Sequence, residues 1–334
     1  MRKMSLAHFF SSLPGLYATQ AFFHSLVAGA IVEIAIVAFR IGSPFVRQRL
    51  LLIAIVFPVF SYPLFQLTDP ARGSVYFRMG ALFDSSRWVN VELPGPVPLG
   101  AVLILVFLLT AVVFLAQELL PILRHTFLSR RAGPPAGLRE GNDPAVRAAL
   151  DSLPVEKPET HILEDEDPVL FSSTGKDASI FLSSGLLKTL TPEELQAALA
   201  HEIAHILRSR RPFLLPVFFL RIAMFFNPVV LVEFRRSVQE DEKICDEMAA
   251  SFTKKPLDLA GALRKLYLGA EPSPDAERKN ARKVAERVEE YSHRLNIEGR
   301  ISRLETGPAS GAGGDWPVFL LTLGTVVVIN YFVV

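Results

Sequence analysis

The stretch Thr191-Pro-Glu-Glu-Leu-Gln-Ala-Ala-Leu-Ala-His-Glu-Ile-Ala-His-Ile-Leu207 decides how the rest of the chain is interpreted. Thr191 and Glu194 have the spacing of a capping box, and Pro192 takes the first helical position, where its missing N–H costs nothing. No glycine or proline interrupts the chain until well past the histidines. The stretch therefore predicts a helix over residues 192–209.

This helix carries His201 and His205 one turn apart on one face, with Glu202 near the same rim. The three residues fit the pattern H-E-x-x-H, in which two imidazoles bind one zinc ion and the glutamate acts as a general base on water. The alternative is an ordinary amphipathic helix whose histidines are merely satisfied polar groups. The surrounding sequence has to distinguish the two.

The composition indicates a membrane protein that carries a polar domain. Half of the 334 residues are hydrophobic, 21% are charged and the formal net charge is +1, while the mean hydropathy is +0.32. The balanced charge gives no reason to expect direct nucleic acid binding. Cys245 is the only cysteine, which excludes an internal disulfide framework and a cysteine-based zinc cluster. Any metal must be held by histidine and carboxylate groups.

Apolar runs predict a three-helix transmembrane region over residues 1–123, because each run is long enough to cross a hydrocarbon core of ~30 Å. The expected spans are 21–39, 50–67 and 98–120. A linker and a C-terminal transmembrane helix are expected over 306–334. Residues 1–20 lack a compact apolar segment with a cleavage site, so no cleaved signal peptide is expected.

Arginine clusters at 40–49 and 124–131 predict which loops are cytoplasmic. The loop 68–97 and the N-terminus are then outside, although Arg2 and Lys3 oppose this orientation. Residues 124–305 are accordingly expected to form a cytoplasmic domain that contains the histidine helix.

Two ionisable residues, His24 and Glu33, lie inside the first expected span. Such residues are functional candidates by default. We favour a structural role in which Glu33 is protonated or faces a neighbouring helix. A transporter that uses both residues is the weaker alternative, because the spans show no internal repeat.

The first part of the polar domain is expected to contain little regular structure. Residues 132–143 indicate a linker, 144–152 a short helix, and the region around His161 an acidic, solvated loop rather than a metal site. Strands are expected at 169–172 and 179–183, with a turn between them. The second strand is a candidate to pair with an extended substrate.

A catalytic zinc site needs a third protein ligand. Asn227-Pro228 predicts the start of a helix that runs to about Phe252, and on it Glu242 and Asp246 lie one turn apart among apolar residues. We expect Glu242 to be the third ligand and Asp246 to hold a histidine Nδ1–H. The alternative is that both acids pair with nearby arginines.

Two charge patterns are interpreted as solvated faces. One is the stripe at positions 233, 236, 240, 243 and 247, and the other is the Glu/Lys/Arg-rich stretch from 275 to 303.

The zinc ligands must lie on one side of the membrane, so the apolar segment 212–232 cannot cross it completely. We expect a membrane-associated helical hairpin, with one arm over 212–226 and the other over 228–252. Arg221 suits an arm that stays near an interface or against protein.

The motifs resemble two groups of membrane zinc peptidases. The segment Ser183-Ser-Gly-Leu-Leu187, the following Leu-Thr-Pro-Glu-Glu-Leu and the H-E-x-x-H helix are similar to the HtpX and CAAX-prenyl-protease group and to the BlaR/MecR antirepressor peptidases. Phe225-Phe-Asn-Pro228, Glu242-Lys-Ile-Cys-Asp246 and Gly299-Arg-Ile-Ser-Arg-Leu304 resemble the BlaR/MecR group more closely. The beta-lactam sensors of that group carry an extracellular penicillin-binding domain after the last span, where this sequence stops, so beta-lactam sensing is not expected.

The resemblance implies a gluzincin-like α+β zinc peptidase domain inserted between transmembrane helices of a mainly α integral membrane protein. It implies one Zn²⁺ per chain, with His201, His205 and Glu242 as ligands and Glu202 as the catalytic base. Tyr267, Tyr291 and His293 are candidates for the oxyanion donor.

The expected location is a bacterial-type inner membrane, with the active site facing the cytoplasm. The expected partners are the lipid bilayer and a protein or peptide substrate, for which a transcriptional repressor or a membrane protein is a candidate. The competing hypothesis is a non-catalytic membrane sensor or scaffold with a structural zinc site.

Overall fold

The computed structural model divides the chain into two compact units. It describes residues 6–93, 97–120, 138–140, 142–173, 178–209, 214–268, 283–307 and 315–334. The first unit comprises Met1–Ala132, Leu214–Glu240 and Ser310–Val334, and the second comprises Gly133–Phe213 and Asp241–Ala309. The arginine cluster at 124–131 lies outside the described residues.

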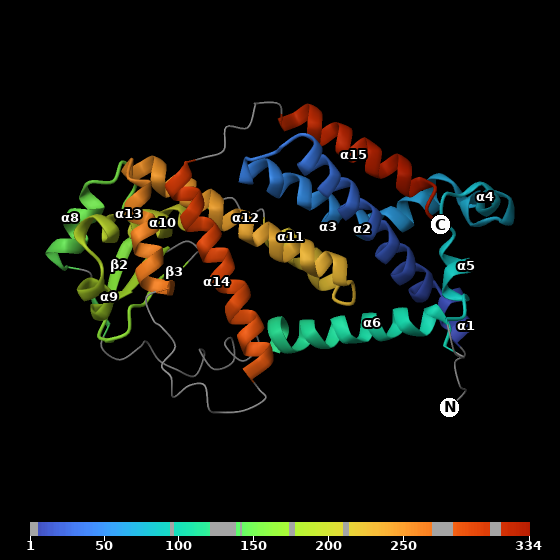
Figure 1. The fold of residues 1–334 in the computed structure, drawn as a ribbon, viewed down its shortest axis with the longest axis horizontal. Helices are drawn as coiled ribbons and strands as arrows, with labels where there is room; N and C mark the ends of the chain where they lie inside the picture. Colours follow the sequence, from blue (N-terminus) through green and yellow to red (C-terminus); the bar gives the residue numbers. More distant parts are fainter. Residues whose placement is uncertain are drawn as a thin grey trace. The chain divides into compact units, whose positions relative to one another are not determined.

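Apolar helices build the first unit, and three of them are long and apolar enough to cross a membrane. Their bounds are α2 (Leu13–Ala38), α3 (Pro44–Thr68), and α6 (Leu99–Phe114) with its π-helical continuation η2 (Leu115–Leu119). A short α1 (Leu6–Ser11) precedes them, and the apolar α15 (Asp315–Tyr331) is shorter than the three spans. The helices α2 and α3 lie side by side (Figure 1), and α15 packs against both. Residues of α2, α3 and α15, such as Val32, Leu50 and Val326, form a fully buried core between them.

Short helices fill the connection between α3 and α6. They are η1 (Pro70–Gly73), α4 (Val75–Gly80) and α5 (Ser85–Val89). The buried Arg72 of η1 donates hydrogen bonds to carbonyl groups at the end of α15, among them that of Tyr331 at 2.8 Å. This guanidinium therefore satisfies helix-terminal carbonyls that have no partner within α15.

The segment that was predicted to fold back forms two helices, α11 (Leu214–Ala223) and α12 (Pro228–Thr253). Asn227 caps α12, because its Oδ1 accepts hydrogen bonds from the backbone N–H groups of Val229 and Val230 at 3.1 and 3.4 Å. The helix start predicted at Asn227-Pro228 is thus confirmed. In the first unit, α11 packs against α3.

Arg221 of α11 is completely buried against protein, as the sequence suggested. Its guanidinium lies 3.3 Å from the Glu118 carboxylate and 4.6 Å from the centre of the Phe114 ring.

Glu33 of α2 faces a neighbouring helix and forms an ion pair with Arg236 of α12 at 2.5 Å. His24 is buried and contacts the Ser61 hydroxyl at 2.6 Å.

The charged stripe on α12 is not a solvated face. Glu233 and Glu240 are buried, and Glu240 lies 3.8 Å from Arg47. Further along, Glu247 pairs with Arg303 at 2.5 Å. The prediction was wrong because alternating charges on a helix look the same in sequence whether water or opposite charges cover them.

A four-stranded sheet lies in the second unit, with strand order β1-β2-β4-β3. Its strands are β1 (Leu138–Glu140), β2 (Glu159–Leu163), β3 (Leu170–Ser172) and β4 (Ser179–Ser183). Strands β2 and β4 are parallel, and the other two pairs are antiparallel. The predicted β3 and β4 are confirmed, whereas β1 lies in the expected linker and β2 contains His161 in place of the expected loop. Strand β2 has only five residues, and so short a segment shows too little alternation of polar and apolar residues to be distinguished from a loop.

Strand β4 lies between β2 and β3, so both of its edges are paired. It therefore cannot take up a substrate strand, which corrects the expectation for residues 179–183. The edge position belongs to β3.

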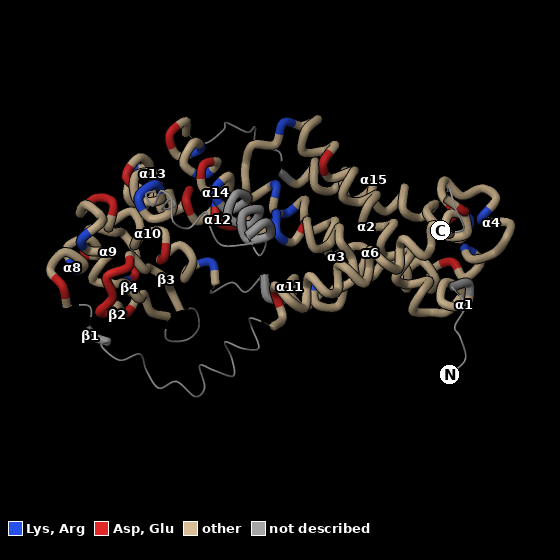
Figure 2. Tube along the Cα trace, turned by 60° about the horizontal axis from the view of Figure 1, so that its bottom comes forward, with Lys and Arg blue, Asp and Glu red and all other residues tan. Residues whose placement is uncertain are grey.

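Helices complete the second unit (Figure 1). They are α8 (Pro144–Asp151), α9 (Ser184–Thr189), α10 (Pro192–Ser209), α13 (Pro256–Leu263) with its π-helical continuation η3 (Arg264–Leu268), and α14 (Lys283–Thr306). Their core includes Ile180, Leu199 and Leu259. Charged residues are frequent on these helices and sparse along α2, α3, α6 and α15 (Figure 2).

The segment Ser183–Leu187 contains Gly185, at the start of α9, and the structure shows why a glycine is needed there. Its N–H donates to the Asp165 carbonyl at 2.8 Å. A Cβ atom at this position would lie 2.0 Å from the Glu166 carbonyl oxygen, which only glycine avoids.

Candidate metal centre

The predicted capping box fixes the start of α10. The Thr191 N–H donates to Glu194 Oε2 at 2.8 Å, and the Glu194 N–H donates to Thr191 Oγ1 at 3.3 Å. The helix ends at Ser209, as expected, and it places the buried His201 and the half-buried His205 on one face.

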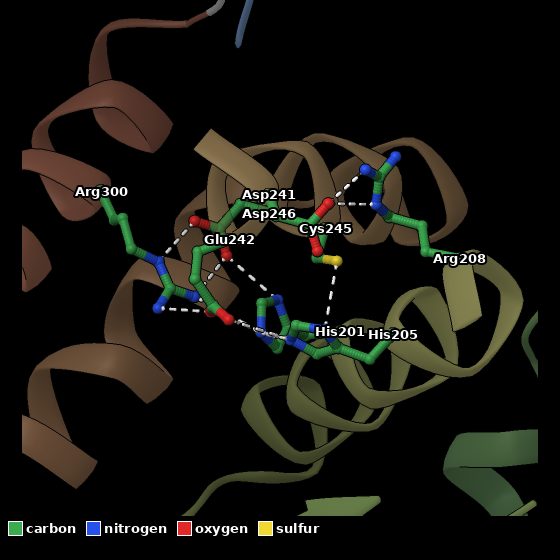
Figure 3. A network of polar contacts seen from close by, with 8 residues as sticks. All are labelled: His201, His205, Arg208, Asp241, Glu242, Cys245, Asp246 and Arg300. Carbon is green, nitrogen blue, oxygen red and sulfur yellow. Dashed lines mark hydrogen bonds and ion pairs between the residues drawn. The ribbon is translucent and has the colours of Figure 1, made fainter. Parts of the chain in front are cut away.

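Three side-chain groups meet in front of this face (Figure 3). The Nε2 atoms of His201 and His205 lie 3.0 Å apart, and the Glu242 carboxylate oxygens lie 3.6 Å from the first and 3.5 Å from the second. A tetrahedral zinc ion with bonds of ~2.0–2.1 Å separates its ligand atoms by about 3.3 Å. The donor set therefore fits zinc in both chemistry and spacing.

Asp246 lies one turn after Glu242 on α12 and supports the other nitrogen of His201. Its Oδ1 lies 3.0 Å from His201 Nδ1, which is the arrangement that orients a metal-binding imidazole. The carboxylate is buried, so its charge needs a partner.

Arg300 of α14 supplies that partner. Its Nε and Nη2 atoms donate to the two oxygens of Asp246, each at 2.7 Å, and its Nη1 lies 3.0 Å from Glu242 Oε2. Figure 3 shows this guanidinium beside both carboxylates, and its Nη2 also lies 3.4 Å from His201 Nε2. The bidentate geometry fixes the orientation of Asp246 as well as compensating its charge.

The charges of this cluster depend on one another. Burial lowers the pKa of His201, but contacts with Asp246 and Glu242 outweigh it and raise the pKa to about 9. Burial raises the pKa of Glu242, yet His201, His205 and Arg300 hold it well below its usual range, and Arg300 and His201 likewise lower the pKa of Asp246 against its burial. Two carboxylates and a protonated imidazole thus share the site when no metal competes for His201.

A second group of donors lies beside the first and shares His205. Cys245 Sγ is 3.4 Å from His205 Nδ1, and Asp241 lies close to both. Arg208 Nε donates to Asp241 Oδ1 at 2.7 Å, so this carboxylate already has a cation. Burial and the surrounding carboxylates raise the pKa of the Cys245 thiol, which keeps it protonated and unsuited to metal binding.

A cavity of about 230 Å³ opens next to His201 and is lined by Glu202. Tyr267 and Arg300 also line it, and Val169 and Leu170 at the start of β3 form another part of its wall. Of the three expected oxyanion donors, Tyr267 thus lies at the site. The side chains of Tyr291 and His293 lie outside the described residues.

Arg300 is the site residue that we did not identify from sequence, because the stretch around it was interpreted as solvated. The residues around Arg300 contain a sequence pattern that could have identified it. Ile297, Ile301 and Leu304 are buried on α14, and Arg300 at 8% exposure lies on the same stripe. A charge inside an apolar helical stripe needs a partner, which is the argument that did identify Glu242 and Asp246 on α12.

The chain matches known proteins over the region that contains His201, His205 and Glu242. Residues 96–289, more than half of the chain, match the family described as BlaR1 peptidase M56. The chain is also similar to a Protease HtpX homolog of Thermoanaerobacter pseudethanolicus, with 44% identity over 66 residues, or 19% of this chain and 21% of that protein. A Protease HtpX homolog of Polaromonas naphthalenivorans is 37% identical over 82 residues, or 21% of this chain and 28% of that protein.

The HtpX proteins are the more distant relatives, since this chain covers only 21% to 28% of their length. The resemblance to the BlaR/MecR group is confirmed by the longer family match. The family match covers α6, whose continuation with η2 is one of the three helices long and apolar enough to cross a membrane. The chain belongs to the BlaR1 peptidase M56 family.

Proposed function

We propose that this protein is a zinc-dependent endopeptidase of the bacterial inner membrane that cleaves a protein substrate at the cytoplasmic face. The observation that carries the proposal is the triangle of His201, His205 and Glu242, whose donor atoms lie 3.0 to 3.6 Å apart beside a cavity lined by Glu202. Three protein donors and an accessible carboxylate are typical of catalytic zinc sites.

Zinc held by these three side chains supplies Lewis-acid chemistry that polarises the scissile carbonyl and makes water a better nucleophile. Glu202 takes a proton from the attacking water, and the oxygen adds to the carbonyl carbon. Glu202 then delivers this proton to the amide nitrogen, so that the C–N bond breaks. The second water proton passes from the new carboxyl group to the amine, which leaves a carboxylate and an ammonium group. Tyr267 and Arg300 line the cavity and are the candidates to stabilise the negative oxygen.

The free edge of β3 is the proposed docking place for the substrate backbone. Ser183 N–H donates to the Val169 carbonyl at 2.9 Å, and Ser173 N–H donates to the Ser179 carbonyl at 2.8 Å. Antiparallel strands alternate the direction of their peptide groups, so Leu170 and Ser172 point theirs away from β4. No strand among the described residues covers this edge, and an extended segment can add to it.

The competing function is a sensor or scaffold with a structural zinc site. Structural sites normally have four protein ligands. Among the described residues, the group formed by His201, His205 and Glu242 contains no fourth histidine, cysteine or carboxylate. This favours a catalytic zinc site over a structural one.

The proposed cytoplasmic orientation rests on the arginine clusters at 40–49 and 124–131. The candidate substrate is a repressor or a membrane protein.

The test is a peptide-cleavage assay on the full chain in detergent, with metal content measured on the same sample. We expect one zinc per chain, loss of cleavage with a chelator, and recovery when zinc is added back. X-ray absorption at the zinc edge should show nitrogen and oxygen ligands only. Zinc that binds without any cleavage, or through a sulfur ligand at ~2.3 Å, would favour the scaffold.

A further inference from the structure

The outer face of the sheet carries a row of three stacked rings that leads to the active-site edge. His161, Phe181 and Phe171 come from β2, β4 and β3, and the register places them directly opposite one another. The ring centres of His161 and Phe181 are 5.0 Å apart, as are those of Phe181 and Phe171, with interplanar angles of 28° and 10°. The row therefore runs across the sheet and ends on the edge strand.

Phe171 is the exposed end of this row. Its side chain is 46% exposed, and no described ring other than Phe181 contacts it. The neighbouring Leu170 points to the opposite face, where it packs against the core and lines the cavity beside Glu202. One short strand thus presents a cavity wall on one face and an uncovered aromatic ring on the other.

The length of β3 limits what main-chain pairing can contribute to binding. Only Leu170 and Ser172 direct peptide groups to the free edge within the three-residue strand. A substrate held by so few main-chain hydrogen bonds needs side-chain contacts as well. Phe171 is well placed, because a residue opposite it on an added antiparallel strand forms a non-hydrogen-bonded pair, in which side chains approach most closely.

We propose that the ring row formed by His161, Phe181 and Phe171 is a substrate subsite that selects an extended segment with an aromatic side chain opposite Phe171. The proposal rests on the proposed peptidase function and names a feature of its substrates. An aromatic side chain continues the stack by one ring, whereas an aliphatic side chain covers the ring without stacking geometry. Aromatic pairs contribute about 0.5–1.5 kcal/mol beyond area burial, which corresponds to about a two- to thirteenfold preference.

The test uses the zinc-loaded full chain and a set of peptides that share one sequence, with phenylalanine or alanine at each position around the cleaved bond. We expect one position at which kcat/KM for the phenylalanine peptide exceeds that for the alanine peptide by about two- to thirteenfold. Phe171→Ala should reduce this ratio to about one, because the phenylalanine peptide loses its stacking partner. Phe171→Tyr should retain the preference.

Leu257→Ala is the matched control, because Leu257 is an exposed apolar residue of α13 that does not line the cavity. It should leave the ratio unchanged. The inference is overturned if the wild type has no aromatic preference at any position, or if Phe171→Ala retains one. It is also overturned if Phe171→Ala changes only the oligomeric mass, since the edge then pairs with a second copy of the chain.

Failure of the peptidase function gives a different result. In that case none of the peptides is cleaved by the wild type, whatever residue stands at position 171.

Discussion

At the scale of single residues, the site depends on buried charges that compensate one another. Glu242 and Asp246 could be identified from sequence because they interrupt an apolar helix face, and the structure brings both to the histidines. Arg300 is 54 positions away from Asp246 in the chain. No local pattern encodes that distance, and only the fold shows that the two residues meet.

Asp246→Asn tests the support given to His201. The amide keeps the shape of the side chain but removes the negative charge that favours a metal-binding imidazole. We expect zinc affinity to fall by about 10- to 100-fold, measured by competition with a chromophoric chelator. Glu247→Gln is the control, because Glu247 is the next residue and pairs with Arg303 instead. Equal zinc affinities in the two variants would contradict the assigned role of Asp246.

Zinc binding should depend on pH because zinc and a proton compete for His201. The pKa of about 9 in the folded, metal-free protein is above the value of about 6.5 for an unfolded chain. The charged imidazole therefore contributes to the folding stability of the metal-free protein. This contribution is complete below pH 6.5 and is lost as the pH rises through about 9.

The apparent zinc association constant should accordingly rise about tenfold per pH unit up to pH 9 and then level off. Calorimetry at pH 7.5 in two buffers of different ionisation enthalpy should detect about one proton released from His201 per zinc. Binding that is constant between pH 7 and 9 would show that His201 is neutral before zinc arrives.

At the scale of elements, sequence patterns predicted helices better than strands. The capping box of α10 and the Asn-Pro start of α12 are local signals, and both helices begin where expected. Strands β1 and β2 were missed because they are short, and their stability comes from pairing with distant segments. The π-helical turn η2 was also unexpected, and it presents Glu118 to Arg221 of α11.

Glu118→Ala tests whether this pair holds the α11–α12 hairpin in the first unit. The substitution leaves the completely buried Arg221 without its carboxylate. Breaking a buried pair in this way typically costs about 3–5 kcal/mol, so thermal unfolding in detergent should shift to lower temperature. The double variant Glu118→Leu/Arg221→Met should recover most of the loss, since no buried charge remains. Unchanged unfolding of Glu118→Ala would show that the pair contributes nothing.

At the scale of the whole molecule, both units are built from separated parts of the chain. Residues 214–240 and 310–334 belong with the N-terminal helices, whereas 241–309 belong with the sheet and α10. The break between α11 and α12 could be predicted because Asn227-Pro228 is a favourable helix start.

The most direct test of the account is the cleavage rate of Glu202→Gln measured on protein that carries a full zinc complement. Glu202 lines the cavity but is separate from the three zinc donors. We expect one zinc per chain, as in the wild type, with kcat/KM lower by about 10²- to 10⁴-fold. Glu193→Gln, on the exposed first turn of the same helix, should cleave at the wild-type rate. Wild-type cleavage by zinc-loaded Glu202→Gln would contradict the account.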